Sequence, residues 1–211
     1  MRHQSIRAGV PAHIHGMRNV SRLLFAQLLL TLFINSTVGV GIARAREATP
    51  QGPVVENERL SMFVRLFTPQ QMAAFYEARG FPKNAIERLG KTCFLMAHVE
   101  NRSDGILWLE LKNWRFVTTE GELQRLDRHH WQAVWDEIDL PQANRSTFGW
   151  TQLPEVRDLQ PGEPVGGNLV LPRTGESFTL EADFLSGENR RQGRIQVRFE
   201  DLRCAEDAPP Q

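Results

Sequence analysis

The strongest limit on the fold of this chain is the alternation along three segments between residues 93 and 199. In an extended strand successive side chains point to opposite faces, so one face repeats every second residue. In a helix one face repeats about every 3.6 residues. Three segments follow the period of two, with apolar positions at Cys93, Leu95, Ala97 and Val99, at Phe178, Leu180, Ala182 and Phe184, and at Ile195, Val197 and Phe199. The sequence therefore predicts a mainly β protein.

Two further strands extend this pattern. Residues 106–118 predict a long strand, in which a β-bulge near Lys112 would reconcile the two faces that carry its apolar side chains. Residues 165–171 predict another strand. The turns between the later strands contain Gly175 and Gly187. Short strands joined by glycine turns are typical of antiparallel sheets.

Two helices are expected before these strands. Thr68 and Gln71 match a capping box, and the proline between them suits the first helical position. Gly80 ends this helix. A second, shorter helix is expected to follow Pro82 and to end at Gly90.

A third helix is expected after the long strand, because residues 127–140 lose the period of two. Four apolar residues there recur at helical spacing, namely Trp131, Val134, Trp135 and Ile138. Asp127 can cap this helix and Pro141 ends it. We expect residues 147–153 to be extended.

The order of these elements predicts an antiparallel, immunoglobulin-like β-sandwich with an N-terminal helical pair and a short inserted helix. Residues 159–171, followed by Phe178-Thr179-Leu180, resemble the P-G-E-x-V-x-G-x-L-x-F stretch of exported immunoglobulin-like domains of unknown function. In those domains the stretch is a turn that leads into a sandwich strand, so the resemblance implies an accessory binding role. The whole chain is similar to uncharacterised bacterial exported proteins, a likeness that implies no active site.

The N-terminal region has the parts of a secretory signal. Arg18 and Arg22 precede an apolar run at residues 23–34, which ends in small residues and the triplet Ala43-Arg44-Ala45. Cleavage after this triplet would deliver the chain to the periplasm or the exterior. The alternative is an uncleaved inner-membrane anchor at residues 23–42, since about 20 residues can cross a bilayer.

These features divide the chain into four parts. We expect a signal peptide at residues 1–45 and a disordered leader at residues 46–59. A single β-sandwich domain with a helical N-terminal part would occupy residues 60–204. The tail at residues 205–211 is expected to be disordered.

The chain contains two cysteines, Cys93 and Cys204. In an oxidising compartment an even pair predicts a disulfide, which here would join the early and the final strands. The alternative is two buried free thiols. No C-x-x-C motif is present, so a thiol oxidoreductase is not expected.

Charge argues against a nucleic-acid partner. The chain has 25 basic and 25 acidic residues, and residues 1–45 contain five arginines and no acidic residue. Without that leader, 20 basic side chains remain against 25 acidic ones. Nucleic-acid binding requires a basic surface, which this balance does not predict.

No catalytic or metal-binding motif is specific enough to assign. His129 and His130 could bind a metal together with a nearby aspartate, but we expect them to be the solvated start of a helix. Met96 and His98 could bind copper, but we expect His98 to be an ordinary strand residue. Glycoside hydrolases use a pair of carboxylates, and Glu181 and Asp183 could form such a pair. The two residues alternate with core positions, however, so we expect them to face solvent. The sequence lacks a G-x-S-x-G motif. We expect no catalytic residue, no metal and no cofactor.

Tryptophan gives the remaining signal. All five tryptophans fall between Trp108 and Trp150, and core burial is the ordinary fate of such residues. A tryptophan-rich surface could instead receive a peptide or stack on a sugar. The candidate binding residues are Trp131, Trp135, Arg145 and Trp150.

From these observations we expect a non-enzymatic, exported binding or assembly-accessory module of the cell envelope. Its partner would be an envelope protein or glycan. One alternative is a hydrolase that acts on an envelope polymer, with Asp136 or Glu137 as the acid. A membrane-tethered structural protein is the other alternative, if the leader is retained.

Overall fold

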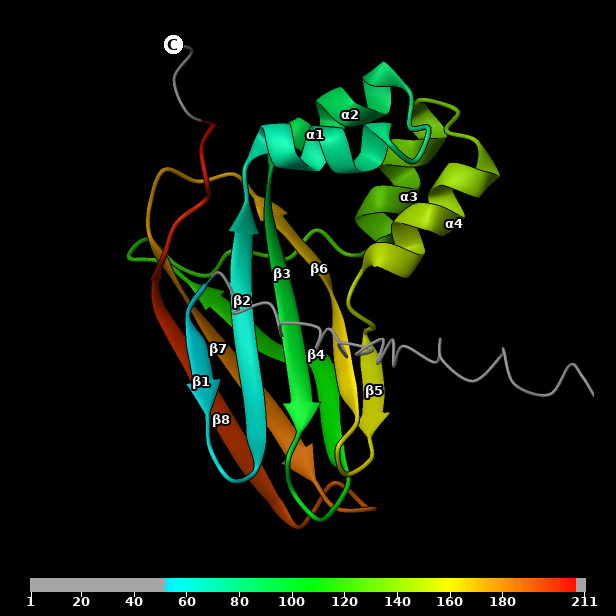
Figure 1. Cartoon of the computed structure of the whole chain (residues 1–211). Helices are drawn as coiled ribbons and strands as arrows, with labels where there is room; N and C mark the ends of the chain where they lie inside the picture. Colours follow the sequence, from blue (N-terminus) through cyan, green and yellow to red (C-terminus); the bar gives the residue numbers. More distant parts are fainter. Residues whose placement is uncertain (1–51, 208–211) are drawn as a thin grey trace, which may run out of the picture. The chain divides into compact units, whose positions relative to one another are not determined.

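The computed structural model describes residues 52–207, which contain four helices and eight strands (Figure 1). The expected signal peptide lies outside the described residues. In chain order the elements are β1 (Val54–Glu56), β2 (Leu60–Phe67), α1 (Pro69–Glu77), α2 (Lys83–Gly90), β3 (Thr92–Asn101), β4 (Leu107–Val117), α3 (Arg128–Glu137), α4 (Gln142–Thr151), β5 (Val156–Leu159), β6 (Pro164–Pro172), β7 (Phe178–Ser186) and β8 (Gly193–Leu202).

The strands form two antiparallel, four-stranded sheets, as the alternating segments predicted. Sheet A has the order β1-β2-β3-β6, and sheet B has the order β5-β4-β7-β8. The chain passes from one sheet to the other after β3, after β5 and after β6. The register of β4 with β7 shifts between Leu109 and Trp114, which confirms the predicted bulge.

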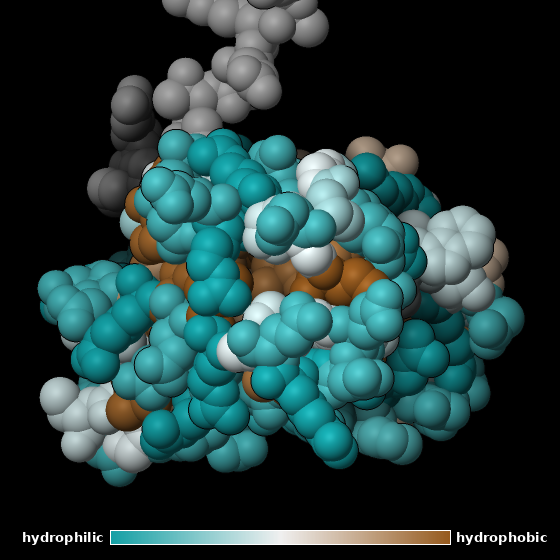
Figure 2. Space-filling model, turned by 90° about the horizontal axis from the view of Figure 1, so that it is seen from below, coloured by the Kyte–Doolittle hydropathy of each residue, from teal (hydrophilic) through white to brown (hydrophobic). Residues whose placement is uncertain are grey.

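The inner faces of the two sheets share one hydrophobic core. Leu95 of sheet A and Leu109 and Phe184 of sheet B are fully buried in it. From the end opposite the helices, hydrophobic residues form a band between hydrophilic residues on both sides (Figure 2). Burial of each such side chain stabilises the fold by about 1.5–3 kcal/mol.

The four helices form a second core on the outer face of sheet A (Figure 1). The sheet contributes Phe94 of β3 and Val170 of β6, which point away from the inner core. Tyr76 of α1 lies at the centre, with its ring centroid 6.1 Å from that of Phe94 and 5.8 Å from that of Phe148. Aromatic packing therefore fixes the helices on one end of this sheet.

Local sequence signals set the helix starts. The Thr68 hydroxyl accepts a 3.2 Å hydrogen bond from the Gln71 amide, and the Gln71 side chain accepts one of 3.1 Å from the Thr68 amide. This reciprocal pair confirms the capping box. Asp127 caps α3 as predicted, because its carboxylate accepts from the His130 amide at 3.0 Å.

Two local predictions are wrong. Residues 147–151, which we expected to be extended, belong to α4, so the insertion after β4 contains two helices. Helix α4 starts directly after Pro141 and buries Phe148 in the helical core, so tertiary packing overrides its polar sequence. In addition, β1 forms at residues 54–56, inside the segment that we expected to be a disordered leader, because it pairs with β2.

The predicted disulfide is present between Cys93 and Cys204, whose Cα atoms are 5.3 Å apart. Cys93 lies in β3 of sheet A, and Cys204 follows β8 of sheet B. The bond therefore connects the two sheets and closes a loop of 111 residues. The loop-entropy model assigns such a closure about 4–5 kcal/mol.

Candidate functional site

The structure separates the four candidate binding residues. Trp131 and Trp135 are each 3% exposed and stack in the helical core, with ring centroids 4.8 Å apart. Trp150, in contrast, is 87% exposed. The expectation of a contact surface that includes Trp131 and Trp135 is therefore wrong in its geometry, because the apolar stripe of α3 faces inward.

Arg145 has a structural role at the junction of α3 and α4. Its guanidinium donates 2.6 Å and 3.0 Å hydrogen bonds to the carbonyl oxygens of Leu140 and Trp135. It also pairs with Asp136. These bonds satisfy carbonyl groups at the end of α3, where helical partners run out.

A hollow of about 320 Å³ lies beside Trp150. Its walls are mainly apolar and its polar lining side chains are uncharged. The lining residues are Phe67, Gln71, Met72, Phe75, Met96, Trp150, Thr151, Gly166, Gly167 and Asn168. The hollow therefore lies where the outer face of sheet A meets α1 and the end of α4.

A buried polar network supports the hollow. The Tyr76 hydroxyl is 2.8 Å from the Thr151 hydroxyl, and the Gln152 amide nitrogen lies within 3.4 Å of both hydroxyl oxygens. Burial raises the pKa of Tyr76 to about 12, although hydrogen bonds to Thr151 and Asn168 act in the opposite direction. Tyr76 therefore stays neutral near pH 7, and the network ties α1 to the end of α4.

Gly167 allows the chain after α4 to cross close to β6. A Cβ atom at this position would lie 2.4 Å from the Leu153 nitrogen and 2.6 Å from the Gln152 carbonyl carbon. At this crossing the Leu153 amide donates a 2.9 Å hydrogen bond to the Asn168 carbonyl. The close approach fixes the end of α4, and with it Trp150, beside the outer face of sheet A.

Two arginines stack on aromatic walls of the hollow. The Arg65 guanidinium lies 4.9 Å from the ring centroid of Phe67, and that of Arg79 lies 3.5 Å from the ring centroid of Phe75. Among residues 52–207 neither arginine forms an ion pair. The two arginines are not lining residues themselves, but each lies over one, and we refer to them as the rim of the hollow. The described part of the chain does not neutralise their positive charge.

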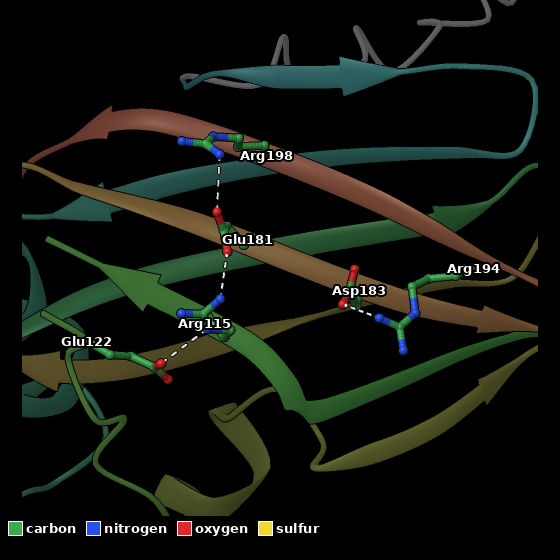
Figure 3. Close-up of polar contacts among 6 residues, drawn as sticks. All are labelled: Arg115, Glu122, Glu181, Asp183, Arg194 and Arg198. Carbon is green, nitrogen blue, oxygen red and sulfur yellow. Dashed lines mark hydrogen bonds and ion pairs between the residues drawn. The ribbon is translucent and has the colours of Figure 1, made fainter.

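Two carboxylates of β7, those of Glu181 and Asp183, pair with arginines of the adjacent strands of sheet B in a charged ladder (Figure 3). Glu181 accepts from Arg115 at 3.3 Å and from Arg198 at 3.2 Å. Asp183 accepts from Arg194 at 3.2 Å. Glu181 and Asp183 thus lie on the outer face of the sheet, as their alternation predicted.

The two candidate acids of a hydrolase are also held in ion pairs. Asp136 pairs with Arg145, and Glu137 pairs with Arg88. Both carboxylate side chains are largely exposed, and neither lines the hollow. The structure therefore does not place either acid at the hollow.

The histidines do not assemble a metal site in residues 52–207, where no group of three potential ligands converges. His98 stacks on Phe63 with ring centroids 5.0 Å apart. His129 and His130 are exposed in the first turn of α3. The pKa of Asp127 is lowered, chiefly by its hydrogen bond from the His130 amide.

Comparison with known proteins assigns no family. No family model matches the sequence, and no curated protein matches it. Two solved structures from Bacillus subtilis are similar, each at 9% identity over 71% of this chain. A "putative lipoprotein (ycdA)" has a TM-score of 0.39 and is matched over 39% of its length, and the yjhA protein has a TM-score of 0.42 and is matched over 96%.

At these TM-scores the likeness supports no functional conclusion. Within the described range, no helix has both the length and the apolar character needed to span a membrane.

Proposed function

We propose that this protein is a non-enzymatic, exported binding module of the cell envelope, and that it contacts its partner at the hollow beside Trp150. The observation that carries the proposal is the 87% exposure of Trp150 next to apolar walls. Large aromatic side chains are rarely left exposed, and tryptophan is enriched among the residues that dominate binding energy.

Two features support export. Residues 18–45 combine a basic start, a short apolar run and an A-x-A exit. The disulfide between Cys93 and Cys204 suits an oxidising compartment such as the periplasm or the exterior. Delivery to such a compartment would bring the hollow into reach of envelope partners.

The strand order supports an immunoglobulin-like sandwich as the scaffold of this module. If β2, β3 and β6 correspond to strands A, B and E, then β5, β4, β7 and β8 correspond to C′, C, F and G. The protein differs from that plan because two helices separate C from C′. Its disulfide also starts in strand B but ends after strand G.

The lining of the hollow supports binding over catalysis. Its polar side chains are those of Gln71, Thr151 and Asn168, which serve as hydrogen-bonding groups. General acid or base catalysis needs a titratable group within hydrogen-bond reach of the substrate. The candidate acids Asp136 and Glu137 are instead exposed and paired with arginines.

The test is retention of the exported protein by cell envelopes isolated from its source. We expect Trp150→Ala to reduce retention about tenfold or more, which is the effect of losing a dominant contact. Val156→Ala is the matched control, because Val156 is 52% exposed on β5 and does not line the hollow. Equal retention of the two variants would contradict the proposal.

A further inference from the structure

We propose that the hollow binds a protein segment in which one bulky apolar side chain is flanked by acidic residues. This inference rests on the proposed function, since it names the chemistry that the same site recognises. Three properties of the site lead to this inference. They are the residue types in its walls, the positive charge on its rim, and the hydrogen bonds that its polar side chains already form within the protein.

The walls have the composition of a protein–protein contact. Phe67, Phe75 and Trp150 supply aromatic surface, and Met72 and Met96 supply flexible thioethers. Aromatic residues, methionine and arginine are enriched at the centres of protein interfaces, where lysine and acidic residues are depleted. Methionine adapts to side chains of different shape. A volume of about 320 Å³ suits a bulky apolar side chain.

The rim determines the charge of the partner. The guanidinium groups of Arg65 and Arg79 lie 4.9 Å and 3.5 Å from the ring centroids of Phe67 and Phe75, the walls contributed by β2 and α1. One terminal nitrogen of Arg79 donates to the Phe75 carbonyl at 2.7 Å. A guanidinium has five N–H donors, so the remaining ones can still bind a carboxylate. Acidic residues on either side of an apolar anchor would therefore complement this rim.

The polar groups of the site favour a protein segment over a glycan. A glycan presents many hydroxyl groups, and each loses hydrogen bonds to water unless the site supplies a partner. In this site the Thr151 hydroxyl already donates to the Phe148 carbonyl at 2.7 Å and lies 2.8 Å from the Tyr76 hydroxyl. The Gln71 side-chain oxygen is used by the capping box. The Gln71 amide nitrogen and the Asn168 side chain remain, which is few for the many hydroxyl groups of a glycan.

Selection from a random dodecapeptide display library tests the inference, with the exported, disulfide-bonded protein as bait. We expect enriched peptides to carry one large apolar residue with aspartate or glutamate within about three positions. The best peptide, made synthetically, should lose its affinity for Trp150→Ala. Its affinity for the double variant Arg65→Gln, Arg79→Gln should fall about tenfold, which corresponds to the loss of charge-assisted bonds.

The control is the double variant Arg128→Gln, Arg191→Gln, which removes the same charge from two exposed arginines that, unlike Arg65 and Arg79, do not lie over a ring that lines the hollow. It should bind the peptide like the unmodified protein. Enrichment of basic or uncharged peptides, no enrichment at all, or equal effects of the two double variants would overturn the inference. Trp150-dependent retention by envelopes, together with binding of purified envelope glycan in place of peptides, would overturn it while leaving the proposed function intact.

Discussion

The outer faces of the two sheets differ in whether their charged side chains have partners of opposite charge within the protein. On sheet B, Glu181 and Asp183 are each paired with arginines from neighbouring strands (Figure 3). On sheet A, helices cover the row that contains Phe94, but next to it lie an exposed tryptophan and two arginines without ion pairs in residues 52–207. The carboxylates of one face are thus matched by arginines of the same sheet, whereas the face that we propose as the contact surface holds two arginines without such partners in residues 52–207.

The same difference separates two sets of arginines. Arginines on both faces are exposed enough to reach solvent, but Arg115 and Arg198 serve carboxylates of their own sheet. Arg65 and Arg79 lie against aromatic rings beside a hollow. The surroundings of each guanidinium, and not its residue type, are the basis on which we propose a contact surface on sheet A.

The largest expected effect concerns the disulfide that connects the two sheets. Replacing Cys93 and Cys204 by alanine removes this bond and should lower the free energy of unfolding by about 4–5 kcal/mol in the loop-entropy model. Urea denaturation of the variant and of the oxidised protein measures this loss. A change below about 1 kcal/mol would show that the loop-entropy model does not apply to this bond.

The next effect tests whether sheet A depends on its helices. Phe94 is 1% exposed and joins β3 to the helical core, so Phe94→Ala should cost about 3–5 kcal/mol. The buried cavity and the lost aromatic contacts with Tyr76 are the cause. Chemical denaturation measures the cost, and a value below about 1 kcal/mol would indicate that the helices pack only loosely on the sheet.

A smaller, pH-dependent effect tests the network beneath the hollow. Because burial raises the pKa of Tyr76 from 10.0 to about 12, the unfolded chain loses this proton at a lower pH than the folded protein does. The stability contribution of Tyr76 is therefore complete below pH 10 and is lost as the pH rises toward 12.

Ultraviolet absorbance can follow this titration directly, because Tyr76 is the single tyrosine of the chain. Tyr76→Phe should cost about 0.5–1.5 kcal/mol near neutral pH, the usual net value of a hydrogen bond, and should remove this residue's part of the alkaline loss of stability. Ionisation of the folded protein near pH 10 would contradict the buried network.

The smallest effect is expected on sheet B. Glu181 is partly exposed and pairs with Arg115 and Arg198 at 3.3 Å and 3.2 Å. Exposed ion pairs contribute about 0–1 kcal/mol, so Glu181→Gln should change the free energy of unfolding by less than about 1 kcal/mol. Thermal denaturation at low and high salt measures it, and a larger loss would show that the ladder is structurally essential.

Much of the fold could be predicted because its signals are local. Alternation identified β3, β7 and β8, and the capping residues Thr68 and Asp127 marked two helix starts. Helix α4 was not predicted, because the sequence of residues 142–151 lacks a strong apolar stripe. Burial of Phe148 against helices distant in sequence stabilises it instead.

The candidate site could not be predicted as a whole, since its lining residues come from β2, α1, β3, α4 and β6. Helical spacing correctly grouped Trp131 with Trp135, but periodicity does not tell a buried stripe from an exposed one. The adjacent glycines Gly166 and Gly167 are the sequence signal that could have indicated part of this site. Glycine inside a strand often marks a close approach of another segment, and here the chain after α4 crosses beside Gly167.

A photocrosslinking amino acid placed at position 149 of the exported protein tests the central claim most directly, because Gly149 is exposed beside Trp150 and an added Cβ atom there would meet no atom within 4 Å. Position 156 on β5 provides the exposed control site outside the hollow. The account predicts a discrete crosslinked envelope product from position 149, absent at position 156 and lost in the Trp150→Ala background. Identical products from both positions, or none from position 149, would contradict it.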